Sequence, residues 1–147
     1  MSSLLNVESS FDLAKNQYHY KKDLIIIAGP TCVGKSLIAM KLAEKIDGVL
    51  INADSVQVYE DLKLLSARPS EEDIRQIPHF LYGYVKSQQN YSIADWLQQL
   101  SKVLLYIEKI KKTAILVGGS GLYLNAAING LAPIPRLREE IKKESLL

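Results

Sequence analysis

A chain of 147 residues can bury a core of its own within one domain, and its formal net charge of +2 is too small to predict nucleic-acid binding by itself. The single cysteine, Cys32, excludes an internal disulfide and a cysteine-rich metal site, and it suits a reducing cytoplasm. The sequence contains no apolar run long enough to span a bilayer, so we expect no membrane partner.

The first part of the chain divides into a polar extension and an apolar strand. Residues 1–22 begin serine-rich and lack the apolar core of a secretory signal, so we interpret them as a flexible N-terminal extension. Residues 23–28 are almost continuously apolar, which predicts a strand buried on both faces of a parallel sheet. A glycine-rich loop follows this strand directly.

A helix and a second strand come next. Residues 35–46 carry apolar side chains at helical spacing, namely Leu37, Ile38, Leu42 and Ile46. We expect Gly48 to end this helix, and we expect the apolar run of residues 49–52 to form a second buried strand.

The second half of the chain repeats this alternation. Ser92 followed by Asp95 resembles a capping box and predicts the start of a helix. The apolar positions of that helix are Ile93, Trp96, Leu97, Leu100, Leu104 and Ile107, and its last turn is expected to hold Lys109, Lys111 and Lys112. Residues 114–117 predict a third buried strand and residues 121–128 a short helix. The alternation indicates an α/β fold with a mostly parallel sheet.

The glycine-rich loop fits the phosphate-loop pattern at each fixed position, which are Gly29, Gly34, Lys35 and Ser36. Glycines allow the backbone to approach an anion closely, and the inward N–H groups and the following helix N-terminus favour negative charge. Lys35 supplies a full positive charge, and Ser36 can place its hydroxyl on a Mg²⁺ ion that bridges phosphate oxygens. We expect the diphosphate or nucleotide site to comprise Gly29, Pro30, Thr31, Cys32, Val33, Gly34, Lys35 and Ser36. We interpret Cys32 as a small residue at a permissive position rather than a redox group.

The loop recognises two adjacent phosphates without identifying the molecule that carries them. An NTPase, a small-molecule kinase and an enzyme that expels pyrophosphate can all use such a loop. No Asn-Lys-x-Asp motif follows the third strand, which argues against a GTPase. That strand also ends in glycines rather than in the acidic residue that anchors magnesium in motor ATPases.

A carboxylate follows the second strand instead. Asp54 is expected at the carboxyl end of a parallel strand, which is the edge where open α/β sheets bind ligands. We expect the strand that feeds the phosphate loop to be the neighbour of this strand, so that Asp54 can accept a proton from an attacking nucleophile. A helix cap and an indirect contact with magnesium are the alternative roles for this carboxylate.

Four blocks appear in order, at residues 27–31, 34–36, 51–59 and 115–123. Together they closely resemble the tRNA dimethylallyltransferases, also called isopentenyl-pyrophosphate:tRNA transferases. The Asp-Ser-x-Gln-Val-Tyr block at residues 54–59 is far more specific than the phosphate loop. Shorter matches are Ala67-Arg68-Pro69, Ile77-Pro78-His79, Tyr91-Ser92 and Asn129-Gly130-Leu131. The resemblance runs from about Leu24 to the end of the chain. It implies a P-loop NTPase-like three-layer fold that is incomplete at its C-terminus, since family members are about twice as long.

The resemblance also implies a reaction. A prenyltransferase of this family moves the dimethylallyl group of dimethylallyl diphosphate onto the exocyclic amine of the adenine just 3′ of the tRNA anticodon, and pyrophosphate leaves. Lys35 and Mg²⁺ on Ser36 would stabilise the leaving group, and Asp54 would be the catalytic base. The residues expected to contact the tRNA anticodon loop are Asp54, Ser55, Val56, Gln57 and Ser120. We expect a monomeric cytoplasmic enzyme.

The same resemblance divides the chain into the extension at 1–22, a P-loop prenyltransferase core at 23–135, and a helical start of a truncated insertion or C-terminal region at 136–147. The sequence departs from the residues common in the family at Phe80, Arg68 and Ser120, where histidine, lysine and threonine are usual.

Three alternative functions remain at this point. They are an inactive or split fragment that only binds diphosphate, a P-loop small-molecule kinase that uses ATP, and an isopentenyltransferase that acts on free adenine nucleotides.

Overall fold

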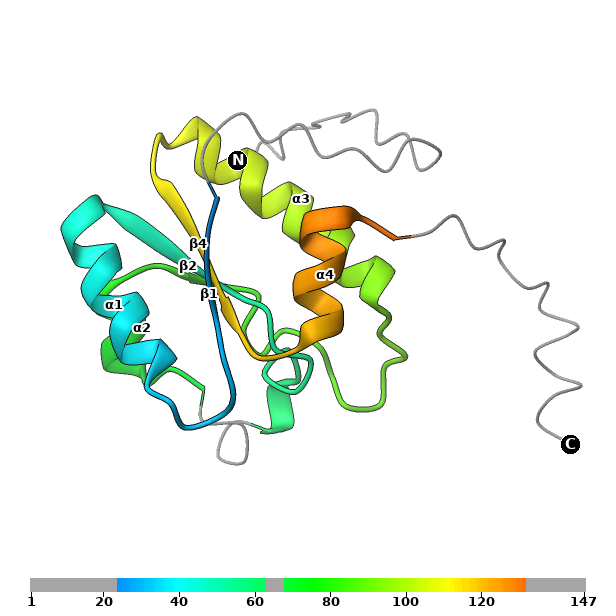
Figure 1. Ribbon diagram of the computed structural model, residues 1–147. Helices are drawn as coiled ribbons and strands as arrows, with labels where there is room; N and C mark the ends of the chain where they lie inside the picture. Colours follow the sequence, from blue (N-terminus) through cyan, green and yellow to red (C-terminus); the bar gives the residue numbers. More distant parts are fainter. Residues whose placement is uncertain (1–23, 63–67, 132–147) are drawn as a thin grey trace, which may run out of the picture.

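A computed structural model describes residues 24–62 and 68–131, and the extension and C-terminal segment predicted at 1–22 and 136–147 lie outside them. The described sheet has four strands, and every pair of neighbours is parallel. Its order is β1 (Leu24–Ala28), β4 (Thr113–Gly118), β2 (Gly48–Asn52) and β3 (His79–Phe80). The predicted α/β alternation with a parallel sheet is thus confirmed in this part of the chain (Figure 1).

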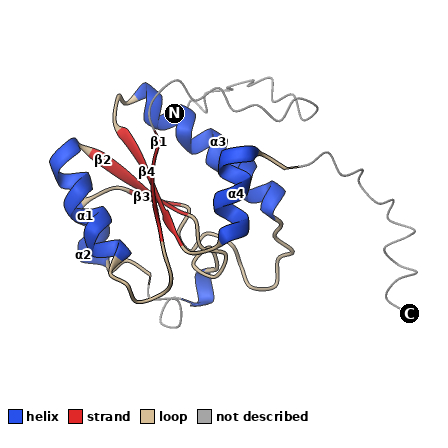
Figure 2. Ribbon diagram, in the orientation of Figure 1, coloured by secondary structure: helices blue, strands red, loops and turns tan. Residues whose placement is uncertain are grey.

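Helices cover both faces of this sheet, which makes a three-layer arrangement (Figures 1 and 2). α1 (Lys35–Ile46) and the short α2 (Glu71–Gln76) lie on one face, and α3 (Ile93–Lys109) and α4 (Gly121–Asn129) lie on the other. The apolar core has one cluster for each face. The cluster under α1 is built from Ala39, Ala43, Leu50, Ile77, Ile115 and Val117. The cluster under α3 and α4 includes Val49, Ile51, Trp96, Leu100, Leu116 and Ala126.

The strand order corrects one expectation, because β4 separates β1 from β2. Strand β4 pairs with both neighbours over five positions, and its Ile115 and Leu116 are fully buried. The central place therefore goes to a strand whose side chains are covered on both faces. β1 is only partly buried over Leu24–Ile27, which corrects the prediction of a strand buried on both faces, since the described sheet has no strand beyond it.

Helix α1 has the predicted bounds but a different buried face. Ala39 and Ala43 are fully covered, whereas Leu37 and Ile38 are 61% and 57% exposed. Small residues occupy the buried positions of this helix because they let it approach the sheet closely. The helix ends at Ile46, and its C-cap is Asp47, in the left-handed region with φ +52°, rather than Gly48. Gly48 instead begins β2, where a Cβ atom would lie 2.8 Å from Cδ1 of Ile115.

Helix α3 begins with the predicted capping box. The Asp95 N–H donates to Oγ of Ser92 and the Ser92 N–H donates to Oδ2 of Asp95. The predicted apolar stripe is confirmed, since its positions from Trp96 to Ile107 are buried and Ile93 packs against them. Only Lys109 stands in the last turn, because the helix ends there, so the prediction is wrong for Lys111 and Lys112. Lys112 pairs with Asp47 over 2.6 Å.

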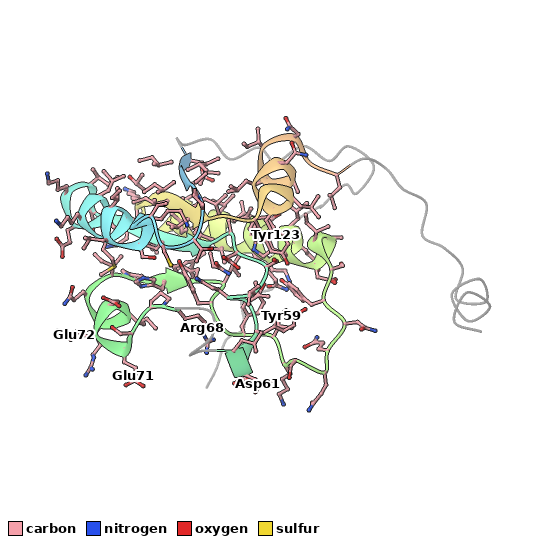
Figure 3. The ribbon with its side chains drawn as sticks, turned by 60° about the horizontal axis from the view of Figure 1, so that its bottom comes forward. Tyr59, Asp61, Arg68, Glu71, Glu72 and Tyr123 are labelled. Atoms are coloured by element: carbon pink, nitrogen blue, oxygen red, sulfur yellow. The ribbon has the colours of Figure 1, made fainter. Side chains whose placement is uncertain are left out.

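Three short elements were not predicted. They are the 3-10 helix η1 (Glu60–Leu62), α2 and β3. Helix α2 also begins with a capping box, formed by Ser70 and Asp73, so its start carries a sequence signal of the same kind as that of α3. Figure 3 shows Arg68 between α2, which carries Glu71 and Glu72, and the η1 segment, where the Arg68 guanidinium donates to the Glu60 carbonyl over 2.8 Å.

Candidate active site

The phosphate loop leaves β1 and enters α1 through two left-handed residues. Cys32 has φ +67° and Gly34 has φ +84°, and α1 begins at the next residue. The Nζ atom of Lys35 donates a 2.6 Å hydrogen bond to the Pro30 carbonyl, so the ammonium group lies across the loop. A helix N-terminus and an ammonium group are thereby directed at one concavity, which suits an anion.

Asp54 lies two residues beyond the end of β2, just past the carboxyl end of the strand as the sequence predicted. Its Oδ1 atom accepts a 2.8 Å hydrogen bond from the Val56 N–H, and its own N–H donates to Oδ1 of Asn52 over 2.9 Å. The first bond closes a local turn of the kind that aspartate favours. The carboxylate is therefore fixed by backbone contacts at the carboxyl edge of the sheet.

Asn52 is a site residue that sequence reasoning missed. Its side chain is fully buried, and Nδ2 donates to the carbonyls of Asp54 and Leu81 over 3.0 Å each. Its carbonyl accepts a 3.1 Å hydrogen bond from Nε1 of Trp96, whose ring lies 4.5 Å from that of Tyr123. Because these bonds join β2 to α3 and to the loop after β3, Asn52 holds the Asp54 turn in one place.

Two glycines bring the phosphate loop and the Asp54 turn together across β4. A Cβ atom at Gly118 would lie 2.9 Å from Cα of Ala53, and one at Gly119 would lie 2.9 Å from the Gly29 carbonyl. Ala53 also donates its N–H to the Val117 carbonyl over 2.8 Å. The intervening strand therefore ends without side chains, and the two loops meet over its main chain.

Ser120 links the Asp54 turn to α4. Its Oγ atom accepts a 2.9 Å hydrogen bond from the Ser55 N–H and donates to Oγ of Ser55 over 3.2 Å. Ser120 is the N-cap residue of α4, yet its side chain makes no capping hydrogen bond to that helix. A group that ordinarily stabilises a helix end is used here to position a neighbouring loop.

These segments enclose a cavity of about 440 Å³. Its lining residues are Thr31, Cys32, Gly34, Lys35, Ser36, Asp54, Val56, Gln57, Tyr82, Val117 and Gly118. The predicted diphosphate residues and the predicted base thus face one space. Of the other predicted site residues, Gly29, Pro30, Val33, Ser55 and Ser120 stand outside this lining.

Tyr82, which the sequence analysis did not single out, is the aromatic member of that lining. Burial is the main reason that its pKa rises above the ordinary value of 10.0, and the nearby Asp54 carboxylate contributes to the rise. Its phenol therefore stays neutral at physiological pH. The neighbouring His79 lies edge-on to it, with ring centroids 5.4 Å apart.

Comparison with known proteins places the chain in a family. The model of a family described as IPP transferase matches residues 57–146. The chain belongs to the IPP transferase family. Two curated IPP transferase relatives, both named tRNA dimethylallyltransferase, come from Hyphomonas neptunium and Rhizobium etli. The first is 48% identical over 120 residues, or 82% of this chain and 38% of the relative. The second is 39% identical over 144 residues, or 98% of this chain and 44% of the relative.

Solved structures of IPP transferases have the same fold. The tRNA isopentenylpyrophosphate transferase of Bacillus halodurans superimposes with a TM-score of 0.74 at 32% identity, over 84% of this chain and 41% of that one. A eukaryotic dimethylallyltransferase described as acting on tRNA superimposes with a TM-score of 0.71 at 29% identity, over 81% of this chain and 31% of that one. This IPP transferase chain thus spans about two fifths of the length of the curated relatives that it matches.

The lining of this IPP transferase cavity is compatible with a magnesium ion. Mg²⁺ commonly binds one or two protein oxygen ligands together with water and substrate phosphates. The exposed Ser36 hydroxyl supplies an oxygen of this kind in the cavity. Among the described residues, no group of three or more His, Cys, Asp or Glu side chains could hold a metal on its own. Nor is any helix in the described ranges long and apolar enough to cross a membrane.

Proposed function

We propose that this chain binds dimethylallyl diphosphate and transfers its dimethylallyl group to the exocyclic amine of the adenine just 3′ of the anticodon in tRNA, with release of pyrophosphate. The observation that carries the proposal is the single cavity lined by Lys35, Ser36 and Asp54. A phosphate-binding loop and a proton-accepting carboxylate in the lining of one cavity suit transfer from a diphosphate to an amine. Membership of the IPP transferase family supports the same reaction.

The donor half of the site would stabilise the leaving group. As the allylic C–O bond breaks, its electron pair moves onto the diphosphate, and negative charge increases on oxygens that face the loop. The loop N–H groups and the Lys35 ammonium bind the charged product more strongly than the intact donor, so they lower the barrier. A Mg²⁺ ion held by Ser36 and the diphosphate would supply further charge neutralisation when bound.

The acceptor half would be the turn at residues 54–57. The amine nitrogen donates its lone pair to the allylic carbon, the new N–C bond forms, and Asp54 takes the proton that the nitrogen loses. Val56 and Gln57 line the same cavity and are placed to contact the base. An adenine stacked in an anticodon loop cannot reach this space, so the base must leave its stack to react.

Transfer of label from dimethylallyl diphosphate to unmodified tRNA tests the proposal. We expect label in tRNA in the presence of magnesium and no label in AMP. We also expect the chain to carry out this transfer as a monomer. Transfer to AMP alone would assign the chain to free adenine nucleotides. Diphosphate binding without any transfer would favour a function limited to donor binding, which the partial coverage of the relatives also allows. Because the acceptor is tRNA, we also propose a cytoplasmic location.

A further inference from the structure

A second cavity of about 440 Å³ lies against the first. The two spaces share three lining residues, which are Ser36, Tyr82 and Val117. Ser36 belongs to the phosphate loop and Val117 ends the central strand, so both are fixed by the fold. Tyr82 is the largest side chain of the three, and it lines both cavities.

The lining of the second cavity is unsuited to another anion. Lys41 and Arg68 are balanced there by Glu44 and Asp73, so the charges cancel in number. The remaining wall includes apolar side chains from α1 and β2, namely Leu37, Met40 and Leu50. Leu37 is 61% exposed although it is apolar, which leaves hydrocarbon surface available to a ligand. A neutral, apolar occupant fits such a space better than a phosphate does.

The backbone on both sides of Tyr82 is held firmly. The carbonyl of Leu81 accepts a 3.0 Å hydrogen bond from the buried Asn52 amide, and the Gly83 N–H donates to the Gln57 carbonyl over 2.8 Å. The Tyr82 ring is braced by His79, whose Nδ1 is bonded to the Ile77 carbonyl over 2.7 Å. A side chain on so fixed a support acts as a wall rather than as a movable flap.

We propose that Tyr82 limits the length of the prenyl chain of the donor, and that the cavity behind it is an extension of the donor site that a longer allylic chain would occupy if the ring were removed. The inference rests on the proposed function, since it takes the loop at residues 29–36 to hold the donor diphosphate. We take the five-carbon group to occupy the part of the first cavity between Lys35 and Asp54, with its far end toward the shared boundary at Tyr82. Carbons beyond the fifth would then collide with the phenol.

Binding measurements on the purified chain with Mg²⁺ test this inference without depending on transfer. Dissociation constants are measured for inorganic pyrophosphate, dimethylallyl diphosphate and geranyl diphosphate. We expect the wild-type chain to favour the dimethylallyl donor. We expect Tyr82→Ala to raise the affinity for geranyl relative to dimethylallyl diphosphate by at least about tenfold, because pocket size controls discrimination among apolar groups. Tyr82→Phe keeps the ring and is expected to keep the wild-type preference.

A second substitution distinguishes the loss of the Tyr82 side chain as a wall from a general loosening of the cavity. Adding Met40→Phe to Tyr82→Ala places a larger side chain in the second cavity, so we expect the preference for the short donor to return. If Tyr82→Ala does not fold, Tyr82→Leu is measured instead, and a smaller shift in the same direction is expected.

Inorganic pyrophosphate distinguishes the two ways in which the inference can fail. If the wild-type chain binds neither pyrophosphate nor the donors, the proposed function and this inference both fall. If pyrophosphate affinity is retained in the folded variants while the geranyl-to-dimethylallyl ratio stays at the wild-type value, only the assignment of Tyr82 is wrong. A wild-type chain that binds geranyl diphosphate as well as the short donor would contradict that assignment too.

Discussion

The Ser55 N–H donates a 2.9 Å hydrogen bond to the Oγ atom of Ser120, although the two residues are 65 positions apart. This bond ties the turn that carries Asp54 to the start of α4. It also gives the predicted tRNA-contacting residue Ser120 a second role, which is to hold the loop rather than only to face the substrate.

Removal of the Ser120 hydroxyl is expected to slow transfer without weakening donor binding. Ser120→Ala leaves the Ser55 N–H without its partner, and a lost hydrogen bond of this kind is worth about 1 kcal/mol, so we expect about a three- to tenfold loss of kcat/KM for tRNA. Ser120→Thr keeps a hydroxyl and is expected to retain most activity. Transfer kinetics beside pyrophosphate affinity check this, and an equal loss in both quantities would contradict a role confined to the acceptor loop.

Gly118 and Gly121 form a matched pair of glycines with opposite surroundings. A Cβ at Gly118 would press on the Ala53 backbone, whereas a Cβ at Gly121 would meet nothing within 4 Å. Overpacking of this kind costs about 1–3 kcal/mol, and here it also separates the two loops of the site. We expect Gly118→Ala to lower the free energy of unfolding by at least that much and to abolish transfer. Gly121→Ala, measured by the same urea titration, is expected to be harmless, and equal effects would refute the packing argument.

The buried amide of Asn52 is expected to be essential for stability. Asn52→Ala removes two donated hydrogen bonds and one accepted bond, so several buried backbone groups lose their partners at about 1–3 kcal/mol each. We expect a loss of about 2–4 kcal/mol in the free energy of unfolding. Asn125→Ala is the control, because Asn125 is exposed and its Oδ1 atom accepts a hydrogen bond from the exposed Asn129. Thermal and urea unfolding of both variants decide the matter.

Lys35 and Asp54 are expected to affect different steps. Lys35→Ala removes the ammonium group from the phosphate loop, and we expect pyrophosphate affinity to fall by about 10- to 150-fold, which corresponds to a charge-assisted contact of about 1.5–3 kcal/mol. Asp54→Asn keeps the size of the side chain but removes the base, so we expect near wild-type pyrophosphate affinity and a loss of transfer of about 10²–10⁴-fold. Lys45→Ala, on the exposed end of α1, is the charge control. Wild-type transfer by Asp54→Asn would remove Asp54 as the base.

Stability is expected to fall as the pH drops from 7.5 toward 5.5, and His79 is one cause. Burial is the main influence on its pKa and lowers it below the ordinary value of 6.5, although the bond to Ile77 and the charge of Asp73 act in the other direction. The unfolded chain then binds the proton more readily than the folded chain, so protonation favours unfolding. His79 contributes full stability above pH 6.5 and loses it as the pH falls through the lowered pKa.

His79→Asn tests this pH dependence, because an amide can replace the bond to the Ile77 carbonyl but does not titrate. We expect urea unfolding of this variant to show a smaller loss of stability than wild type between pH 7.5 and 5.5. The lowered pKa values of Asp61 and Asp73, caused mainly by hydrogen bonds from Ser87 and Ser70, place their titration at more acid pH and outside this window. Parallel pH curves for the two proteins would show that His79 is not involved.

The parts of the fold that the sequence predicts are those governed by local periodicity. The helix that contains Trp96 and the buried strands at 49–52 and 114–117 are each identified by their own apolar pattern. The order of the strands depends on contacts between distant segments, and the expected pairing of β1 with β2 was therefore wrong. The two-residue strand β3 is too short to carry a period at all.

The residues of the candidate site likewise divide into those that local motifs identify and those that depend on distant contacts. The loop at 29–36 and the carboxylate of Asp54 belong to contiguous motifs, so they can be found without a structure. Asn52 and Tyr82 are different, because their importance depends on partners elsewhere, such as Leu81, which is 29 residues from Asn52. Asn52 lies within the block at 51–59 and Tyr82 lies three residues after His79, but no local pattern distinguishes a buried connector from an ordinary polar or aromatic side chain.

The absence of side chains at Gly118 and Gly119 couples the two loops of the site to each other. The main chain of Ala53 and the carbonyl of Gly29 both pack against this strand end, so no side chain that could change its rotamer lies between the two loops. A shift of a few tenths of an ångström in one is transmitted to the other as a rigid displacement. We therefore expect occupancy of the phosphate loop to alter the affinity for the acceptor, and thermodynamic reciprocity requires the acceptor to alter donor affinity by the same factor.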